Sequence, residues 1–374
     1  MNRKYKKLFE SIKLGNGIET KNRFAMAPML VFGSNDDDTL GNEDIEYFSV
    51  RNDTGGIIIT GAVAVSEDGH GMEKQITIFD DDKVPGLTKL ASTIKEKDNL
   101  AIMQLHNAGR ESRGTYKRKG VTYAPSKIDF PFLDYTPEEL TSKQIDGFIK
   151  DYGQATRRAI EAGFDGVEIH GANHYLIQQF FSAYSNRRED KWGGSLEKRM
   201  NFAIAVIDEV NSIIEKYADD SFIVGYRLSP EEVHGENVGY KVSEAIKLID
   251  QIIEHGMDYI HLSMAKYDDI PADGTSDEPI ARTIYKAVDG RVPVMAAGSA
   301  LTPDDALDLL NYVDIVALGR AVIIDPDFVV KIREGREDEI ETSVENRFDD
   351  LKLPETLKRF WKAEGSPLPP LKGM

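Results

Sequence analysis

The segment Ser142–His170, SKQIDGFIKDYGQATRRAIEAGFDGVEIH, joins a long helical pattern to a short β-branched run. From Ser142 to Ala162 the apolar side chains recur every three or four residues, which is the spacing along one face of a helix. Gly166–His170 follows within a few residues and has the length and composition of a strand. The segment therefore predicts one helix and strand pair of an α/β protein.

The alternation of helix and strand extends outward from this segment in both directions. Leu196–Tyr217 is a second clear helical pattern. Thr302-Pro303-Asp304-Asp305 is typical of a helix start, because it offers an N-cap hydroxyl, an early proline and two acidic side chains near the positive end of the helix dipole. The predicted strands are Phe24–Leu30, Gly56–Val65, Leu100–Leu105, Gly166–His170, Ile223–Leu228, Tyr259–Leu262, Val292–Ala297 and Asp314–Leu318.

Eight strands separated by helical stretches in 374 residues predict a single (β/α)₈ TIM barrel. A doubly wound parallel sheet is the alternative, but no Gly-x-Gly-x-x-Gly motif follows an early strand. No repeat, low-complexity tract or linker divides the chain, so we predict one domain over residues 1–374. It comprises a barrel core at about residues 20–335 and a C-terminal helical extension at residues 336–374, which we expect to pack on the barrel or on a neighbouring subunit.

The long segment Gly109–Lys143 follows the third predicted strand. Loops after barrel strands shape the mouth of the active site, so this segment is a candidate for lining or covering it. The alternative is a surface insertion that packs its own aromatic side chains, Phe130, Phe132 and Tyr135. The sequence alone leaves both interpretations open.

Composition excludes several classes of function. The chain has 46 lysine and arginine residues against 64 aspartate and glutamate residues, a formal charge of −18, whereas a nucleic-acid-binding protein needs a basic surface. The absence of cysteine excludes disulfides, thiol nucleophiles and protein-held iron–sulfur clusters. The longest apolar stretch, Gly55–Val65, is too short to cross a bilayer, so we expect a cytoplasmic protein without nucleic-acid or membrane partners. Acidic pairs such as Asp81-Asp82 are scattered as on a solvated surface, and no metal site is expected.

Two glycine turns are expected at the C-terminal ends of barrel strands, where such barrels place their catalytic groups. Gly298-Ser299 follows the seventh predicted strand and Gly319-Arg320 follows the eighth. Backbone N–H groups and an arginine at this end of a barrel commonly hold a phosphate, and we expect these turns to do so. The alternative is that Gly298 only forms a turn and Thr302 only caps its own helix.

The residues after the fourth predicted strand indicate carbonyl chemistry. His170 and Asn173 can both direct N–H groups into the mouth of the barrel, and Tyr175 can supply a proton from the side. No hydrolytic pair accompanies them. The remaining histidines that we considered are expected to be ordinary core or surface residues: His106, His234, His255 and His261.

Several blocks of the chain resemble the old yellow enzyme family of FMN-dependent ene-reductases. The resemblance spans roughly residues 5 to 335, and its most specific part surrounds the fourth strand, where many residue types recur at fixed spacing. The matching blocks are Asn22–Met29 (NRFAMAPM), Gln104–Arg110 (QLHNAGR), Ile169–Asn173 (IHGAN), Ser185–Ser195 (SNRREDKWGGS), Arg227–Ser229 (RLS) and Leu318–Arg320 (LGR).

The resemblance implies an oxidoreductase with tightly bound FMN that takes hydride from NADH or NADPH by a ping-pong mechanism. The small-molecule substrate would be an activated alkene, the C=C bond of an α,β-unsaturated carbonyl compound. His170 and Asn173 would then bind the carbonyl oxygen, and Tyr175 would be the proton donor. The residues that the resemblance assigns to FMN are Pro28, Met29, Gln104, Arg227, Gly298, Ser299, Gly319 and Arg320.

Two positions depart from the family pattern. After Pro28-Met29 the family usually has Thr or Cys, which donates to the flavin, whereas this chain has Leu30, so we expect an altered flavin potential. His174 stands where a glycine is common, and it either narrows the pocket, adds a donor or faces solvent.

Other functions remain open at this stage. They are an NADH oxidase or flavin reductase on the same fold, a flavin-binding protein without turnover, and a non-redox barrel that acts on a phosphorylated metabolite. A homo-oligomer is also possible. A larger relative of the dienoyl-CoA reductase type needs cysteine-held iron–sulfur, which the absence of cysteine excludes.

Overall fold

Eight parallel strands form a closed barrel in the computed structural model, which describes residues 2–364, 366, 368 and 370–374. The barrel closes because β4 pairs with both β3 and β6, so neither end of the sheet is left open. The predicted TIM barrel is confirmed, and the doubly wound alternative is wrong. In chain order the barrel strands are β3 (Phe24–Met26), β4 (Ile57–Ile59), β6 (Leu100–His106), β9 (Gly166–Gly171), β10 (Ile223–Leu228), β13 (Tyr259–Ser263), β14 (Val294–Ala297) and β15 (Ile315–Leu318).

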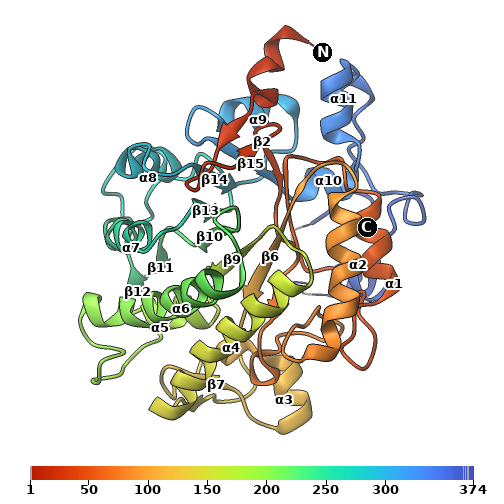
Figure 1. Cartoon of the computed structure of the whole chain (residues 1–374). Coiled ribbons are helices and arrows are strands. Elements are labelled where there is room, and N and C mark those ends of the chain that lie inside the picture. The colour runs from red at the N-terminus through yellow and green to blue at the C-terminus, as the bar shows by residue number, and fades with distance from the viewer. Residues whose placement is uncertain (1, 365, 367, 369) are drawn as a thin grey trace.

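Helices surround the strands, and Figure 1 shows α1, α2, α4, α6, α7 and α8 on the outside of the central strands. The predicted helix Leu196–Tyr217 is α6, and Ser142–Ala162 is α4 with its end one residue earlier. The predicted cap of α9 is also present, because the Thr302 hydroxyl accepts from the N–H of Asp305 at 3.1 Å. The helices between barrel strands are α1 (Asn42–Ser49), α2 (Val84–Lys95), α4 (Ser142–Glu161), α6 (Leu196–Tyr217), α7 (Val242–Glu254), α8 (Ile280–Val288) and α9 (Pro303–Leu309).

Short helices and two-stranded sheets lie in the loops at the two ends of the barrel, and further short helices follow the last strand. The helices are α3 (Arg113–Lys119), α5 (Leu176–Phe181), α10 (Arg320–Ile324), α11 (Phe328–Glu334) and α12 (Glu355–Lys362). The small sheets pair β1 (Ile12–Lys13) with β2 (Glu19–Thr20), β7 (Tyr123–Ala124) with β8 (Glu138–Glu139), and β11 (Glu232–His234) with β12 (Asn237–Tyr240).

Proline and glycine explain where the strand boundaries differ from the prediction. The first strand ends before Pro28 and the seventh begins after Pro293, because proline has no N–H to donate to the ladder. The predicted strand Gly56–Val65 is broken into β4 and β5 (Val63–Ala64), which both pair with β6. At the break, Gly61 lies so close to the segment after β3 that a Cβ there would be 2.4 Å from the carbonyl oxygen of Met29.

Side chains alternate between two apolar layers, as strand geometry requires. Phe24 and Met26 of β3 point outward and pack in the large cluster under the helices. Ala25 and Ala27 point inward, into a separate cluster that fills the barrel with isoleucines from neighbouring strands. Leu14, from the β1–β2 hairpin, belongs to this inner cluster and closes the end of the barrel opposite the mouth.

The inner layer becomes polar toward the C-terminal ends of the strands. Glu168 of β9 is fully buried there and accepts hydrogen bonds from the Tyr259 hydroxyl at 3.1 Å and from His261 Nδ1 at 2.8 Å. Tyr259 reaches across Gly225, its register partner on β10, and a Cβ at Gly225 would lie 2.0 Å from the tyrosine ring. Glycine at this position therefore makes room for the tyrosine inside the barrel.

The chain after the barrel packs against the barrel. This is one of the two packing partners expected from the sequence, the other being a neighbouring subunit. The buried guanidinium of Arg51 donates through NH2 to the carbonyl of Leu351 at 2.9 Å, and Arg347 donates to the carbonyl of Ile324 at 2.9 Å. Phe360 of α12 packs on Phe32 with ring centroids 4.8 Å apart. These contacts hold α12 over the barrel mouth.

The segment Gly109–Lys143 packs mainly on itself. Tyr135 stacks on Tyr116 at 4.1 Å and donates to the carbonyl of Arg110 at 3.0 Å, while the Arg110 guanidinium lies 4.3 Å from the Phe130 ring. None of its described residues lines the cavity at the barrel mouth. Arg110, Glu111, Pro131 and Phe132 line a second cavity beside it, so the segment combines its own aromatic packing with a place next to the barrel mouth.

Across the described part of the chain, no helix is both long enough and apolar enough to span a bilayer.

We expect Gly225→Ala to lower the free energy of unfolding by about 3 kcal/mol, because the added methyl displaces Tyr259 and breaks its hydrogen bond to Glu168. Urea unfolding at a fixed excess of FMN measures the change. The matched control is Gly147→Ala in α4, where a Cβ meets nothing within 4 Å and should raise stability by about 0.5–1 kcal/mol. Equal effects of the two substitutions would contradict the packing role of Gly225.

Candidate active site

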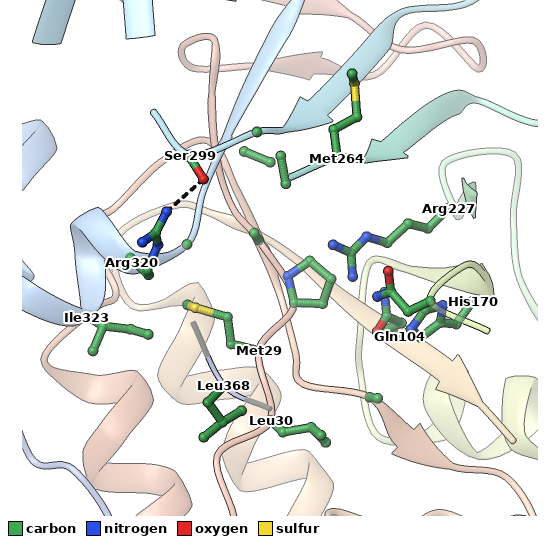
Figure 2. A pocket seen from close by; sticks show the side chains of 18 of the residues that line it. Met29, Leu30, Gln104, His170, Arg227, Met264, Ser299, Arg320, Ile323 and Leu368 are labelled. Carbon is green, nitrogen blue, oxygen red and sulfur yellow. Dashed lines mark hydrogen bonds between the residues drawn. The ribbon is translucent and has the colours of Figure 1, made fainter. Parts of the chain in front are cut away.

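A cavity of about 330 Å³ opens at the C-terminal ends of the barrel strands, within the size range of small-molecule sites. Figure 2 shows its lining, with Met29, Leu30 and Leu368 on one side and Arg227, His170 and Gln104 on another. All the residues predicted for the site line this one cavity: Pro28, Met29, Gln104, His170, Asn173, Tyr175, Arg227, Gly298, Ser299, Gly319 and Arg320.

His170 and Asn173 present hydrogen-bond donors to the cavity because the chain occupies their acceptor atoms. Nδ1 of His170 accepts from the N–H of Ala172 at 3.2 Å, so the neutral ring carries its proton on Nε2. Oδ1 of Asn173 accepts from the Ser263 hydroxyl at 2.8 Å, which leaves its amide N–H groups for another partner. Burial, with a smaller contribution from the nearby Arg227 charge, holds the pKa of His170 well below its usual value. The imidazole is therefore a neutral donor.

Tyr175 stands beside this pair of donors. Its ring lies 5.2 Å from the His170 ring and 4.3 Å from the His106 ring, and both contacts are edge-on. Burial raises the pKa of Tyr175 to about 12, so its hydroxyl keeps its proton near neutral pH. The side chain can therefore act as a proton donor. It does not persist as a phenolate anion near neutral pH.

Gln104 presents an acceptor to the cavity because the protein occupies its donor. Its Nε2 donates to Glu168 at 2.7 Å, so its carbonyl oxygen is the atom left for a ligand. Glu168 is fully buried, and burial alone would raise its pKa, but hydrogen bonds from His261 and Gln104 and the charge of Arg227 hold the pKa below its usual value. An ionised Glu168 thus fixes the orientation of the Gln104 amide.

Arg227 contributes a buried cation to the same wall. Its side chain is 7% exposed, and its Nε has no hydrogen-bond partner among the described residues. In Figure 2 the guanidinium of Arg227 extends into the cavity above Gln104 and His170. A buried guanidinium nitrogen without a partner is costly, so this group is arranged to receive an anionic or carbonyl acceptor from a ligand.

The turns after β14 and β15 meet at the other end of the cavity. Arg320 donates to the Ser299 hydroxyl at 2.7 Å, and that hydroxyl donates to the carbonyl of Ala265 at 2.7 Å. Gly298 packs so tightly that a Cβ would lie 2.7 Å from the Tyr267 nitrogen, whereas a Cβ at Gly319 would meet only Met29 Sδ at 3.7 Å. The two turns form a shallow polar cradle with one arginine, which suits a phosphate.

The lining fits FMN in three separate respects. The unpartnered nitrogen of Arg227 and the free oxygen of Gln104 suit the polar edge of a flavin ring. Apolar side chains, including Met29 and Leu30, cover the intervening wall, and the Ser299 and Arg320 cradle suits the phosphate. The donor and acceptor set therefore matches the group that the family resemblance implies.

Sequence analysis missed two kinds of residue at this site. Glu168 lies two positions before His170 on the inward face of β9, and that spacing was the signal that could have found it. Further unpredicted lining residues include Met264 and Ile323, and three from the extension that no local pattern would have placed at the mouth: Leu357, Trp361 and Leu368.

Comparison with known proteins agrees with the geometry. Residues 7–339 match the model of the family described as NADH:flavin oxidoreductase / NADH oxidase. A probable NADH-dependent flavin oxidoreductase, YqiG of Bacillus subtilis (strain 168), is 40% identical over 369 residues, which is 97% of each chain. NADH:fumarate oxidoreductase of Klebsiella pneumoniae (strain 342) is 38% identical over 360 residues, and the match covers 95% of this chain and 39% of that protein.

A solved structure shows the same likeness. The old yellow enzyme homologue from Zymomonas mobilis has a TM-score of 0.75 at 27% identity, covering 88% of this chain and 92% of that one. The family match spans the whole barrel, and the YqiG match spans nearly the whole chain. The chain therefore belongs to the NADH:flavin oxidoreductase / NADH oxidase family, the family of old yellow enzyme, and is an NAD(P)H-dependent oxidoreductase with FMN as its cofactor.

Proposed function

We propose that this enzyme reduces the C=C bond of α,β-unsaturated carbonyl compounds by a ping-pong mechanism. The observation that carries the proposal is the pair of free donors, His170 Nε2–H and Asn173 Nδ2–H, at one cavity with the hydroxyl of Tyr175. Two donors can bind one carbonyl oxygen, and a phenol can then protonate the neighbouring carbon.

His170 and Asn173 hold the substrate by its carbonyl oxygen. Their hydrogen bonds strengthen as negative charge develops on that oxygen, so they stabilise the transition state more than the ground state. Tyr175 delivers its proton to the α-carbon, and its raised pKa keeps that proton available. FMN held in this cavity would supply the hydride for the β-carbon, with NADH or NADPH as its source.

The FMN-binding roles are proposed for the residues that line the rest of the cavity. Arg227 favours the negative charge that a flavin gains on reduction, and Gln104 accepts from the ring's polar edge. Pro28 and Met29 would contact the ring, and Gly298, Ser299, Gly319 and Arg320 would hold the phosphate.

An NADH oxidase or flavin reductase on the same fold is the second candidate, because the matching family description names NADH oxidase activity. Competition separates the two. The consumption of enone and of oxygen is measured in air-saturated mixtures, with anaerobic mixtures as the reference. An ene-reductase should consume the enone before the oxygen. An oxidase should consume oxygen at the same rate with or without the enone. The second outcome would overturn the proposal.

We expect Tyr175→Phe to slow the oxidation of the reduced enzyme by weakly activated enones about 100-fold or more, because the proton donor is lost. Reduction by NAD(P)H should keep its rate, because no proton from Tyr175 is needed there. Anaerobic stopped-flow absorbance measures the two half-reactions separately.

Tyr184→Phe is the matched control for this prediction. Tyr184 lines a neighbouring cavity and is absent from the lining of the proposed site. Its loss should leave both half-reactions unchanged. Equal losses in both half-reactions of Tyr175→Phe would remove Tyr175 from the proton-donor role.

The rate of the enone half-reaction should be flat from about pH 6 to about pH 9. His170 has a pKa well below its usual value and stays neutral over this range, while Tyr175, with a pKa of about 12, stays protonated. Stopped-flow rates measured across this range check the expectation. An inflection near the usual histidine pKa that disappears in His170→Asn would show instead that an imidazolium binds the substrate.

We expect Leu30→Thr to raise the FMN midpoint potential by about 20–30 mV relative to Leu30→Val, because one hydroxyl hydrogen bond is worth about 1 kcal/mol. Valine has nearly the shape of threonine and controls for the lost leucine volume. Spectroelectrochemical titration of both variants measures the difference, and stopped flow measures the reductive rate. If neither quantity changes, Leu30 does not set the potential.

A further inference from the structure

A second cavity, of about 420 Å³, lies beside the proposed active site. Its lining contains His174, Glu232 and His234, each of which offers one ligand atom, and these atoms all lie within 4.8 Å of one another. From the sequence, His234 is expected to be an ordinary core or surface residue, and His174 to narrow the pocket, add a donor or face solvent. The structure brings the two together.

Glu232 is the fixed member of this cluster. Its side chain is 1% exposed, and its two oxygens accept from the Ser182 hydroxyl at 2.7 Å and from Gln178 Nε2 at 2.8 Å. Nδ1 of His174 lies 3.6 Å from Glu232 Oε2. Carboxylates that bind metals are held in this way by hydrogen bonds from a second layer of side chains.

The two histidines come from different elements. His234 follows Glu232 by two positions on β11, and its ring centroid lies 5.2 Å from that of His174. His174 has a φ of 64°, in the left-handed region that glycine adopts more easily. Gln178 Oε1 accepts from the N–H of His174 at 3.0 Å, and Gln179 Nε2 donates to its carbonyl at 2.7 Å, so its backbone is held in place.

We propose that His174, Glu232 and His234 bind one divalent transition-metal ion, with Zn²⁺ as the best match. Two imidazoles and one carboxylate are a known zinc ligand set with one coordination position left open. Zinc bonds of about 2.0–2.1 Å in a tetrahedron place ligand atoms about 3.3 Å apart, close to the observed separation of His174 Nδ1 and Glu232 Oε2. A bound ion would tie the loop after β9 to the β11–β12 hairpin.

Binding requires only a small rearrangement. Nδ1 of His174 lies 3.2 Å from Gln178 Nε2, and the ion replaces this contact while Gln178 keeps its hydrogen bond to Glu232. His234 is exposed and free to turn its ring toward the other two ligands. The fit does not depend on FMN or on the proposed substrate.

The chain offers few other sites that would compete for such an ion. It has no cysteine and seven histidines. Four of the seven are buried: His70, His106, His170 and His261. Of the accessible ones, His255 follows α7 and pairs with Asp208 of α6 at 2.7 Å, and it belongs to no group of three possible ligands among the described residues.

Equilibrium dialysis of the tag-free holoenzyme against Zn²⁺, after removal of metals with a chelator, tests the proposal. Mass spectrometry of the dialysed protein should count one zinc per chain. His174→Gly and His234→Asn should each weaken binding about tenfold or more. His174→Gly should fold at least as well as the parent, because glycine adopts this backbone conformation without strain.

His255→Asn is the matched control, and it should bind zinc as the parent does. Saturating zinc should also raise the melting temperature of the parent and of His255→Asn but not of His174→Gly, because only a complete site joins the loop to the hairpin. The proposal is overturned if the parent binds no zinc below about 100 μM. It is equally overturned if binding persists unchanged in both ligand variants.

Discussion

A single buried carboxylate, Glu168, organises the polar end of the barrel. It has no contact with water, so every lone pair must be satisfied by the protein, and the donors available are Gln104, Tyr259 and His261. Each of these donors is held in place by its hydrogen bond to the charged carboxylate. The requirement also reaches the backbone, because Tyr259 can approach the carboxylate only across a glycine. The barrel mouth is therefore rigid for an electrostatic reason as much as for a packing reason.

Hydrogen bonds within the protein also decide which donors and acceptors the barrel mouth presents to a ligand. An amide or a neutral imidazole has both a donor and an acceptor, and the side that the protein occupies determines which one is left. The chain occupies the acceptor atoms of His170 and Asn173 and the donor of Gln104. The cavity therefore presents donors at one place and an acceptor at another, each oriented by its own partner in the protein. Such preorganisation is the main way in which a protein stabilises developing charge.

The strand positions could be predicted from the sequence because buried parallel strands are short apolar runs, and a barrel collects the residues at their C-terminal ends. The boundaries differed where Pro28, Pro293 and Gly61 interrupt pairing, since those effects depend on which strand lies next to which. Glu168 was missed because a glutamate inside a strand resembles one on an exposed face until its neighbours are known. Trp361 was missed because the extension reaches the mouth only through tertiary contacts. The site roles and the single-domain organisation stay predictions.

The acidic character of the chain and its affinity for an anionic cofactor are compatible because electrostatics at a site are local. The formal charge of −18 is spread over a surface in contact with solvent and is screened within about 10 Å in ordinary buffers. Most of the charged pairs are on that surface, whereas Arg227 and Arg320 face the cavity and form no ion pair among the described residues. Burial lowers the pKa of Arg227, and the ionised Glu168 opposes that shift, so the guanidinium stays charged. An anion that enters the mouth therefore meets two cations that form no ion pair among the described residues, while the acidic exterior repels it elsewhere.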